Sequence, residues 1–298
     1  MNKKILITGI DGFTGRYLAK EMAAAGYDVI GLALKKPGLK VDGAKYIYEC
    51  DLCDFLTLEK NVSEVKPDIV AHLAAIAFVA HGEINDFYKT NLIGSRNLLE
   101  ALLKLDVLPK SILMASSANV YGNQGGILDE SIAPSPTNDY AVSKLAMEYV
   151  ANLYKAQLPI IIVRPFNYTG VGQSINFLIP KIIDHFKRCA PFLELGNLDV
   201  IRDFSDVRSV VKYYRLLIEA KPNGEIFNIC SGNGHSLTDI LKMMNQISGH
   251  YPEIRVNQNF VRTNEVHCLI GLRTKLDFTI KEVEHTPFIE TLKWMLNN

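Results

Sequence analysis

The segment Thr8-Gly-Ile-Asp-Gly-Phe-Thr-Gly15 decides the fold of this chain. An apolar run over 4–8 leads into it and predicts a strand, and an amphipathic stretch from about 14 to 25 predicts a helix. Three glycines at this spacing suit the junction, because they permit a tight turn, close approach of the backbone to a pyrophosphate, and packing of the helix on the sheet. The helix N-terminus would then present free N–H groups to the phosphates.

Further apolar, β-branched runs alternate with amphipathic stretches along the first half of the chain. We expect strands over 4–8, 28–33, 46–48, 68–73, 111–116 and 160–163, helices over about 14–25, 88–105 and 140–153, and a helix that follows the third strand through Leu58 and Val62. This alternation predicts right-handed βαβ units and an α/β fold with a Rossmann-type, doubly wound parallel sheet.

The alternation of strands and helices becomes less regular after Pro165, and no linker rich in Pro, Gly or Ser marks a domain boundary. Helices are expected over about 176–188, 206–219, 236–247 and 287–297, with short strands between them. We therefore expect a dinucleotide-binding domain over 1–165, onto which about 203–229 folds back, and a smaller, interleaved α/β substrate lobe over 166–298.

Composition argues against some kinds of partner and cellular location. The 298 residues carry 32 basic and 32 acidic side chains, which argues against nucleic acid or an anionic membrane as the main partner. The apolar start ends at Thr8, too soon for a signal peptide, and no stretch approaches the ~20 apolar residues of a membrane span. Five scattered cysteines fit free thiols in a reducing cytoplasm, and neither they nor the seven histidines show metal-ligand spacing.

The glycine turn predicts a bound dinucleotide, although an ordinary glycine-rich turn would show the same pattern. The residues expected to contact it are Gly9, Asp11, Gly12, Phe13, Thr14 and Gly15. An acidic residue after the second strand would bind a ribose 2′-hydroxyl. Lys35 and Lys36 stand there instead, which favours the 2′-phosphate of NADP over NAD unless the two lysines only solvate a turn.

Tyr140-Ala-Val-Ser-Lys144 is the second informative segment. Tyr and Lys four residues apart lie on the same face of a helix. A nearby ammonium favours the phenolate, so we expect Lys144 to lower the pKa of Tyr140 and make it a proton donor or acceptor near neutral pH. A bare Tyr-x-x-x-Lys match is more often an exposed helix pair.

Taken in order, these segments resemble the extended short-chain dehydrogenase/reductase family over essentially the whole chain. The matching segments are 8–15, 50–52, 72–75, 90–100, 116–122, 140–144 and 164–167. The resemblance implies that Asp51 and Leu52 hold adenine, that Leu73, Ala74 and Ala75 line the cofactor channel, and that Asn91 lies near the nicotinamide. It also implies cofactor contacts at Pro165 and a catalytic set of Ser117, Tyr140 and Lys144. Helices near 88–105 and 140–154 would pair two subunits into a homodimer.

The choice between reaction types is narrowed by the pair of residues that follows the expected active-site serine. Family members that dehydrate nucleotide sugars carry Glu two positions after this serine, whereas this chain has Ala118 and Asn119 there. Neither can abstract a carbon-bound proton, so dehydration is disfavoured. Epimerases of the family usually retain NAD tightly, and the missing acid after the second strand argues against that. Reduction of a keto group by exchangeable NADPH fits better.

The second half of the chain is similar to the nucleotide-sugar-binding segments of the family. By resemblance, Ser117 and Asn167 contact the sugar or a phosphate, Arg202 and Arg262 bind the diphosphate, Glu265 binds the nucleoside ribose, and Lys181 adds a contact. Surface salt bridges of Arg202 with Asp203 and of Arg262 with Glu265, and a solvated Lys181, are the alternatives.

The chain departs from the family at Thr263, where Pro is frequent, and lacks the usual Gly-Trp-x-Pro turn before its last helices. The resemblance implies NADPH-dependent reduction of a nucleotide-diphospho-4-keto-6-deoxyhexose, best matched by GDP-4-keto-6-deoxy-D-mannose giving GDP-D-rhamnose. The alternatives are a dTDP- or CDP-linked substrate, a talo or fuco product, a 4-epimerase, and a non-catalytic NADP-binding regulator.

Overall fold

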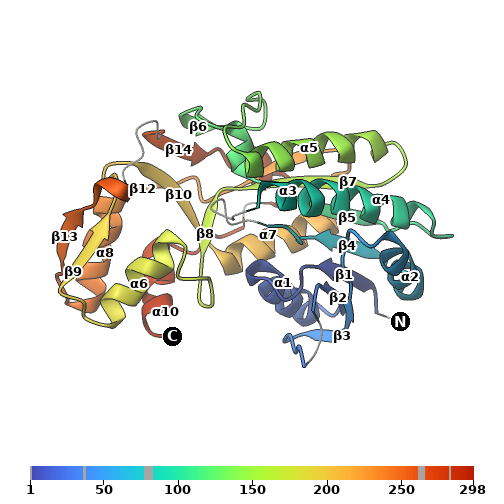
Figure 1. Ribbon diagram of the computed structural model, residues 1–298, viewed down its shortest axis with the longest axis horizontal. Coiled ribbons are helices and arrows are strands. Elements are labelled where there is room, and N and C mark those ends of the chain that lie inside the picture. Colours follow the sequence, from blue (N-terminus) through green and yellow to red (C-terminus); the bar gives the residue numbers. More distant parts are fainter. Residues whose placement is uncertain (1, 36–37, 77–82, 261–265, 282) are drawn as a thin grey trace.

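A seven-stranded parallel sheet forms the centre of the larger part of the molecule (Figure 1). The computed structural model describes residues 2–35, 38–76, 83–260, 266–281 and 283–298. In spatial order the strands are β11 (Ile226–Ile229), β7 (Ile160–Pro165), β5 (Ser111–Ala115), β4 (Ile69–His72), β1 (Lys4–Thr8), β2 (Asp28–Ala33) and β3 (Ala44–Glu49). The order reverses between β1 and β4, which is the switch point where such sheets bind ligands. The α/β class and the Rossmann-type sheet are confirmed.

Helices cover both faces of this sheet. They are α1 (Phe13–Ala24), α7 (Val207–Ala220) and α9 (Thr274–Ile280) on one face, and α2 (Phe55–Val65), α4 (Ser95–Leu103) and α5 (Asp139–Tyr154) on the other. The sequence of β1 is continuously apolar because both of its faces are buried. Ile5 and Ile7 face the core cluster on one side of the sheet, and Leu6 faces the cluster on the other side. A parallel sheet buried on both faces needs this pattern.

The smaller lobe is built on two short sheets. One has the order β12 (Gly234–Ser236), β10 (Ile201–Asp206), β14 (Cys268–Gly271) and β6 (Gly126–Leu128), with β8 (Asn167–Thr169) paired to β10. The other pairs β13 (Glu253–Val256) with β9 (Phe192–Leu195). Helices α6 (Leu178–Lys187), α8 (Leu237–Ser248) and α10 (Phe288–Leu296) enclose the lobe's own core.

The chain crosses between the two parts in both directions. Strand β6 comes from the first half of the sequence but pairs in the lobe's sheet with β14. Strand β10 runs directly into α7, and β11 returns to the edge of the large sheet beside β7. The division of the chain at residue 165 therefore stays a prediction about domains.

The α-helices differ from the sequence expectation in two places. The helix expected over 88–105 consists of a short α3 (Ile84–Phe87), a π-helical segment (Tyr88–Gly94) and α4. Helix α9 was not expected at all. Across the described part of the chain, no helix combines the length and apolar character needed to cross a bilayer.

Candidate active site

The glycine turn lies at the switch point of the sheet and leaves no room for side chains. Gly9 has a positive φ of 66°, and a Cβ built on it would lie 2.8 Å from Cα of Ala74. A Cβ on Gly15 would lie 2.2 Å from the carbonyl oxygen of Gly9. Both positions therefore require glycine, the first for its conformation and contacts and the second for the approach of α1 to the turn.

The N-terminus of α1 fits an anionic ligand. Gly12 is its N-cap and supplies no side chain to bond the first N–H groups, and no acidic residue stands in the first turn. Unbonded N–H groups and a positive helix end suit a pyrophosphate. Nearby, the hydroxyl of Thr14 is 2.7 Å from that of Tyr168, and the Phe13 ring stacks on the Tyr168 ring at 6.1 Å. Tyr168 on β8 was not predicted from the sequence.

The other expected cofactor residues lie at or shortly after the carboxyl ends of β2, β3 and β7. Lys35 is exposed directly after β2, whereas Lys36 lies outside the described residues. Asp51 is exposed and accepts a hydrogen bond from N–H of Cys53, and Leu52 is buried against α2 and α4. Pro165 ends β7 and is half-buried. The roles of these residues in binding a cofactor stay predictions.

A buried chain of hydrogen bonds supports the segment after β4, where Leu73, Ala74 and Ala75 were expected to line the cofactor channel. The N–H groups of Leu73 and Ala74 donate to Oγ1 of Thr8, at 3.2 and 3.1 Å. Thr8 is 2.7 Å from Nδ1 of His72, whose Nε2 is 2.7 Å from Oγ of Ser95. Burial and the charge of Lys144 lower the pKa of His72 to about 3, so this imidazole is neutral.

Asn91 is fully buried in the π-helical segment and bridges two parts of the site. Its Oδ1 accepts from N–H of Ile76 at 2.9 Å, and its Nδ2 donates to Oγ of Ser143 at 3.0 Å. Ser143 in turn donates to the carbonyl of Tyr140 at 2.7 Å. Asn91 therefore ties the segment after β4 to α5, and π-helical turns often mark such functional positions.

Ser117, Tyr140 and Lys144 come together at the ends of β5 and α5. All three side chains are buried, and the Ser117 hydroxyl is a hydrogen-bond partner of the Tyr140 phenol. Ser117 also accepts from N–H of Asn119 at 3.1 Å, which caps the 3-10 turn Ala118–Tyr121. Nζ of Lys144 donates to the carbonyl of Ala115 at 2.8 Å.

The expectation that the pKa of Tyr140 is lowered is wrong. Burial raises the pKa of Tyr140 to about 12, and the opposing influence is the hydrogen bond with Ser117. Burial also lowers the pKa of Lys144 to about 8, with the charge of Glu148 opposing that shift. The physical reason is that both groups are desolvated and that the ammonium is bonded to a backbone carbonyl. The arrangement therefore keeps the phenol protonated.

The substrate residues expected on the lobe are only partly visible. Asn167 is exposed on β8 and donates to the carbonyl of Asp203 at 3.3 Å. Arg202 lies on β10, and Nη1 of its guanidinium donates to its neighbour's carbonyl, that of Ile201. Nζ of Lys181 lies 4.3 Å from the ring centroid of Phe260. Arg262 and Glu265 lie outside the described residues.

Asp203 is not the surface salt-bridge partner that the sequence left open. It is fully buried, and its carboxylate accepts hydrogen bonds from Ser231, from N–H of Gly232 and from N–H of Gly271. It therefore holds the lobe's loops together behind Arg202.

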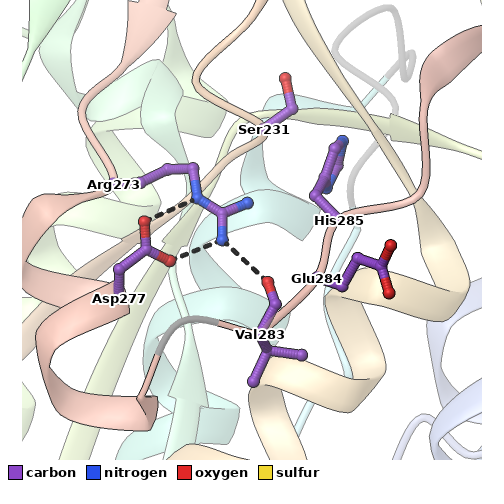
Figure 2. A pocket seen from close by; sticks show the side chains of 6 residues that line it. All are labelled: Ser231, Arg273, Asp277, Val283, Glu284 and His285. Atoms are coloured by element: carbon purple, nitrogen blue, oxygen red, sulfur yellow. Dashed lines mark hydrogen bonds and ion pairs between the residues drawn. The ribbon is translucent and has the colours of Figure 1, made fainter.

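Figure 2 shows a hollow with a volume of about 340 Å³. Its lining residues are Ser231, Arg273, Asp277, Val283, Glu284 and His285. The guanidinium of Arg273 donates to both carboxylate oxygens of Asp277 and to the carbonyl of Val283, so it is occupied in holding α9. No described candidate residue lines this hollow. Within the described ranges, no group of three or more His, Cys, Asp or Glu could hold a metal ion.

Comparison with known proteins identifies the family of this chain. The model of the NAD dependent epimerase/dehydratase family matches residues 5–230. The chain belongs to this family. Its members are nicotinamide-dinucleotide-dependent oxidoreductases and epimerases, and the chain is therefore an enzyme of this kind.

Two curated relatives align along nearly the whole chain. The GDP-6-deoxy-D-talose 4-dehydrogenase of Aggregatibacter actinomycetemcomitans is 38% identical over 274 residues, which are 92% of this chain and 90% of that protein. The GDP-6-deoxy-D-mannose reductase of Pseudomonas aeruginosa is 30% identical, covering 94% of this chain and 91% of its own.

Solved structures agree with this fold. A candidate epimerase from Burkholderia cenocepacia J2315 superposes with a TM-score of 0.93 at 48% identity, covering 99% of this chain and 97% of its own. RMD from Pseudomonas aeruginosa complexed with NADPH gives 0.86 at 27% identity, covering 99% and 98%.

Proposed function

We propose that this enzyme reduces the C4 keto group of a GDP-linked 4-keto-6-deoxyhexose with NADPH. The observation that carries the proposal is the buried group of Ser117, Tyr140 and Lys144 beside a glycine turn that fits a dinucleotide. A bound reduced nicotinamide would supply the hydride. Tyr140, with its pKa raised to about 12 by burial, would donate the proton to the oxygen that becomes the C4 hydroxyl.

The groups around Tyr140 have supporting roles in this proposal. Ser117 would hold the same substrate oxygen, because its hydroxyl adjoins the phenol. The Lys144 ammonium would stabilise the phenolate that Tyr140 becomes after proton transfer. Ala118 and Asn119 supply no carboxylate for elimination, and this supports reduction over dehydration.

GDP-4-keto-6-deoxy-D-mannose is the substrate that the relatives favour, since both curated names specify GDP-6-deoxyhexoses. Dehydrogenase and reductase are the two directions of one hydride transfer, so the names agree in chemistry. The sequence resemblance favours GDP-D-rhamnose as product. The 38% identical relative supports a second candidate, the C4 epimer GDP-6-deoxy-D-talose. Lys35 after β2 supports NADPH over NADH.

The test is a panel of GDP-, dTDP-, CDP- and UDP-linked 4-keto-6-deoxy sugars, each assayed with NADPH and NADH, with the product configuration at C4 read by NMR. We expect the fastest turnover with the GDP sugar and NADPH. Tyr140→Phe should bind NADPH like the wild type but turn over about 10²–10⁴-fold more slowly. No consumption of either nucleotide with any sugar would sink the proposal, and an unaffected Tyr140→Phe variant would leave Tyr140 without its role.

A further inference from the structure

A buried ion pair lies one helical turn beyond Lys144. The Arg164 and Glu148 side chains are only 4% and 5% exposed. The guanidinium binds the carboxylate through two parallel hydrogen bonds, Nε to Oε1 at 2.9 Å and Nη2 to Oε2 at 2.6 Å. This two-pronged geometry is the strong and directional form of an ion pair.

The pair connects three elements that carry the candidate site. Glu148 stands on α5, four residues after Lys144, and Arg164 stands on β7, directly before Pro165. Oγ of Ser116, after the end of β5, donates to the same Oε1 of Glu148 at 2.5 Å. Because Ser116 directly precedes Ser117, one carboxylate fixes the backbone that presents Ser117 to the helix that presents Lys144.

Stability alone does not explain this arrangement. Removing two charges from water costs free energy that a buried pair often fails to recover, and apolar replacements are frequently neutral or stabilising. Nη1 of Arg164 adds to the cost, because it has no hydrogen-bond partner among the residues that the structure describes. The arrangement instead suits a role in holding groups at defined positions.

We propose that Glu148 and Arg164 are positioning residues that hold the Ser116–Ser117 backbone against α5, the helix that carries Tyr140 and Lys144. Neither residue touches the reacting atoms in this proposal. Its catalytic part rests on the proposed function, whereas the anchoring of the strand end does not.

The charges around Lys144 determine how the proposal is tested. Burial lowers the pKa of Lys144 and the Glu148 carboxylate raises it, which leaves the pKa at about 8. The other titratable groups around it are Tyr140 on the same helix, the neutral His72 on β4, and Arg164, which is bonded to Glu148. Glu148→Gln removes the negative charge and leaves Arg164 unpaired, and both changes lower the pKa of Lys144.

We therefore expect Glu148→Gln to lower kcat about tenfold or more while KM and NADPH affinity stay within about threefold. The loss of activity at high pH should begin about half a pH unit or more below that of the wild type. In the free protein, amide hydrogen exchange over 115–119 should be faster. Glu290→Gln, which breaks an exposed ion pair with Lys293 on α10, is the matched control and should change none of these.

A double variant, Glu148→Leu with Arg164→Met, separates positioning from stability. It removes both charges, so its melting temperature should equal or exceed that of Glu148→Gln. Its kcat should still be about tenfold low and exchange over 115–119 still fast. Wild-type kcat and exchange in the double variant, or an unshifted pH profile in Glu148→Gln, would overturn the proposal. An inactive wild type would instead contradict the proposed function and leave the exchange measurement as the test of anchoring.

Discussion

At the scale of the residue, the candidate proton donors owe their behaviour to burial. Tyr140 is desolvated, so its pKa lies near 12 and the phenol stays protonated at any working pH. Lys144 is desolvated too, and its pKa of about 8 places its charge change close to neutrality. In the proposed reduction the phenol is protonated and the ammonium is charged, so Lys144 would set the pH range.

The pH profile follows from this difference. We expect kcat/KM for the reduction to be flat below about pH 8 and to fall about tenfold per pH unit above it, as Lys144 loses its proton. Initial rates from pH 6 to 10 at saturating NADPH check this. Reduction that accelerates through pH 8 would contradict a charged Lys144 in the reaction.

Residue-level prediction from sequence was most specific where a motif has fixed spacing. Ser117, Tyr140 and Lys144 were expected together and are all buried near the end of β5 and the start of α5, and their catalytic roles stay predictions. Glu148 and Arg164 were missed as a pair, because a charged residue in a helix ordinarily indicates an exposed position. The pKa of Tyr140 was mispredicted because sequence spacing carries no information about desolvation.

At the scale of the element, the turn between β1 and α1 acts with the segment after β4 as one packed unit. Gly9 contacts Ala74, and Gly15 contacts Gly9. A side chain at either position would displace the backbone that the dinucleotide is expected to contact.

Gly15→Ala tests this element. The added Cβ would meet the carbonyl oxygen of Gly9 at 2.2 Å, so we expect a loss of about 1–3 kcal/mol in the free energy of unfolding and a large loss of NADPH affinity. Thermal unfolding and titration calorimetry measure the two effects. Gly249→Ala is the control, because it strains a positive φ of 69° at the end of α8 but meets no atom within 4 Å. It should lose about 1 kcal/mol and keep NADPH affinity. Wild-type affinity in Gly15→Ala would refute this role of the turn.

Strands and long helices could be predicted because their periodicity is local. The strand expected over 46–48 is β3 (Ala44–Glu49), and the final helix expected over 287–297 is α10 (Phe288–Leu296). Helix α9 was not predicted because it has only seven residues. Arg273 at its N-cap bonds Asp277 within the helix and makes a tertiary contact with Tyr213 on α7. The π-helical segment was not predicted, because the hydrogen bonds of Asn91 with Ile76 and Ser143 join segments that are distant in the sequence.

At the scale of the whole molecule, the exposed face of α5 is the feature that concerns assembly. Val142, Tyr149 and Leu153 lie at helical spacing on one face and are 38%, 63% and 76% exposed. Exposed apolar side chains aligned on one helix face suit an interaction surface. The homodimer implied by the family resemblance, through helices near 88–105 and 140–154, remains a prediction that these side chains support.

Light scattering after size-exclusion chromatography tests the dimer. We expect the wild type at twice the mass of one chain, and Tyr149→Glu with Leu153→Glu at the mass of a single chain, because two buried carboxylates would oppose pairing. Phe278→Glu on α9, where the side chain is 90% exposed, is the matched control and should remain dimeric. A monomeric wild type would refute this prediction.

In the proposed reaction, NADPH transfers a hydride to C4 of a GDP-linked 4-keto-6-deoxyhexose. The most direct measurement supplies NADPH deuterated at the transferred position of its nicotinamide together with GDP-4-keto-6-deoxy-D-mannose, and then locates the deuterium by mass spectrometry and proton NMR. We expect a product one mass unit heavier that lacks the H4 signal, whereas the product made with unlabelled NADPH shows the H3–H4 and H4–H5 couplings that identify the rhamno or talo configuration. Deuterium at another carbon, or an unlabelled sugar, would contradict it.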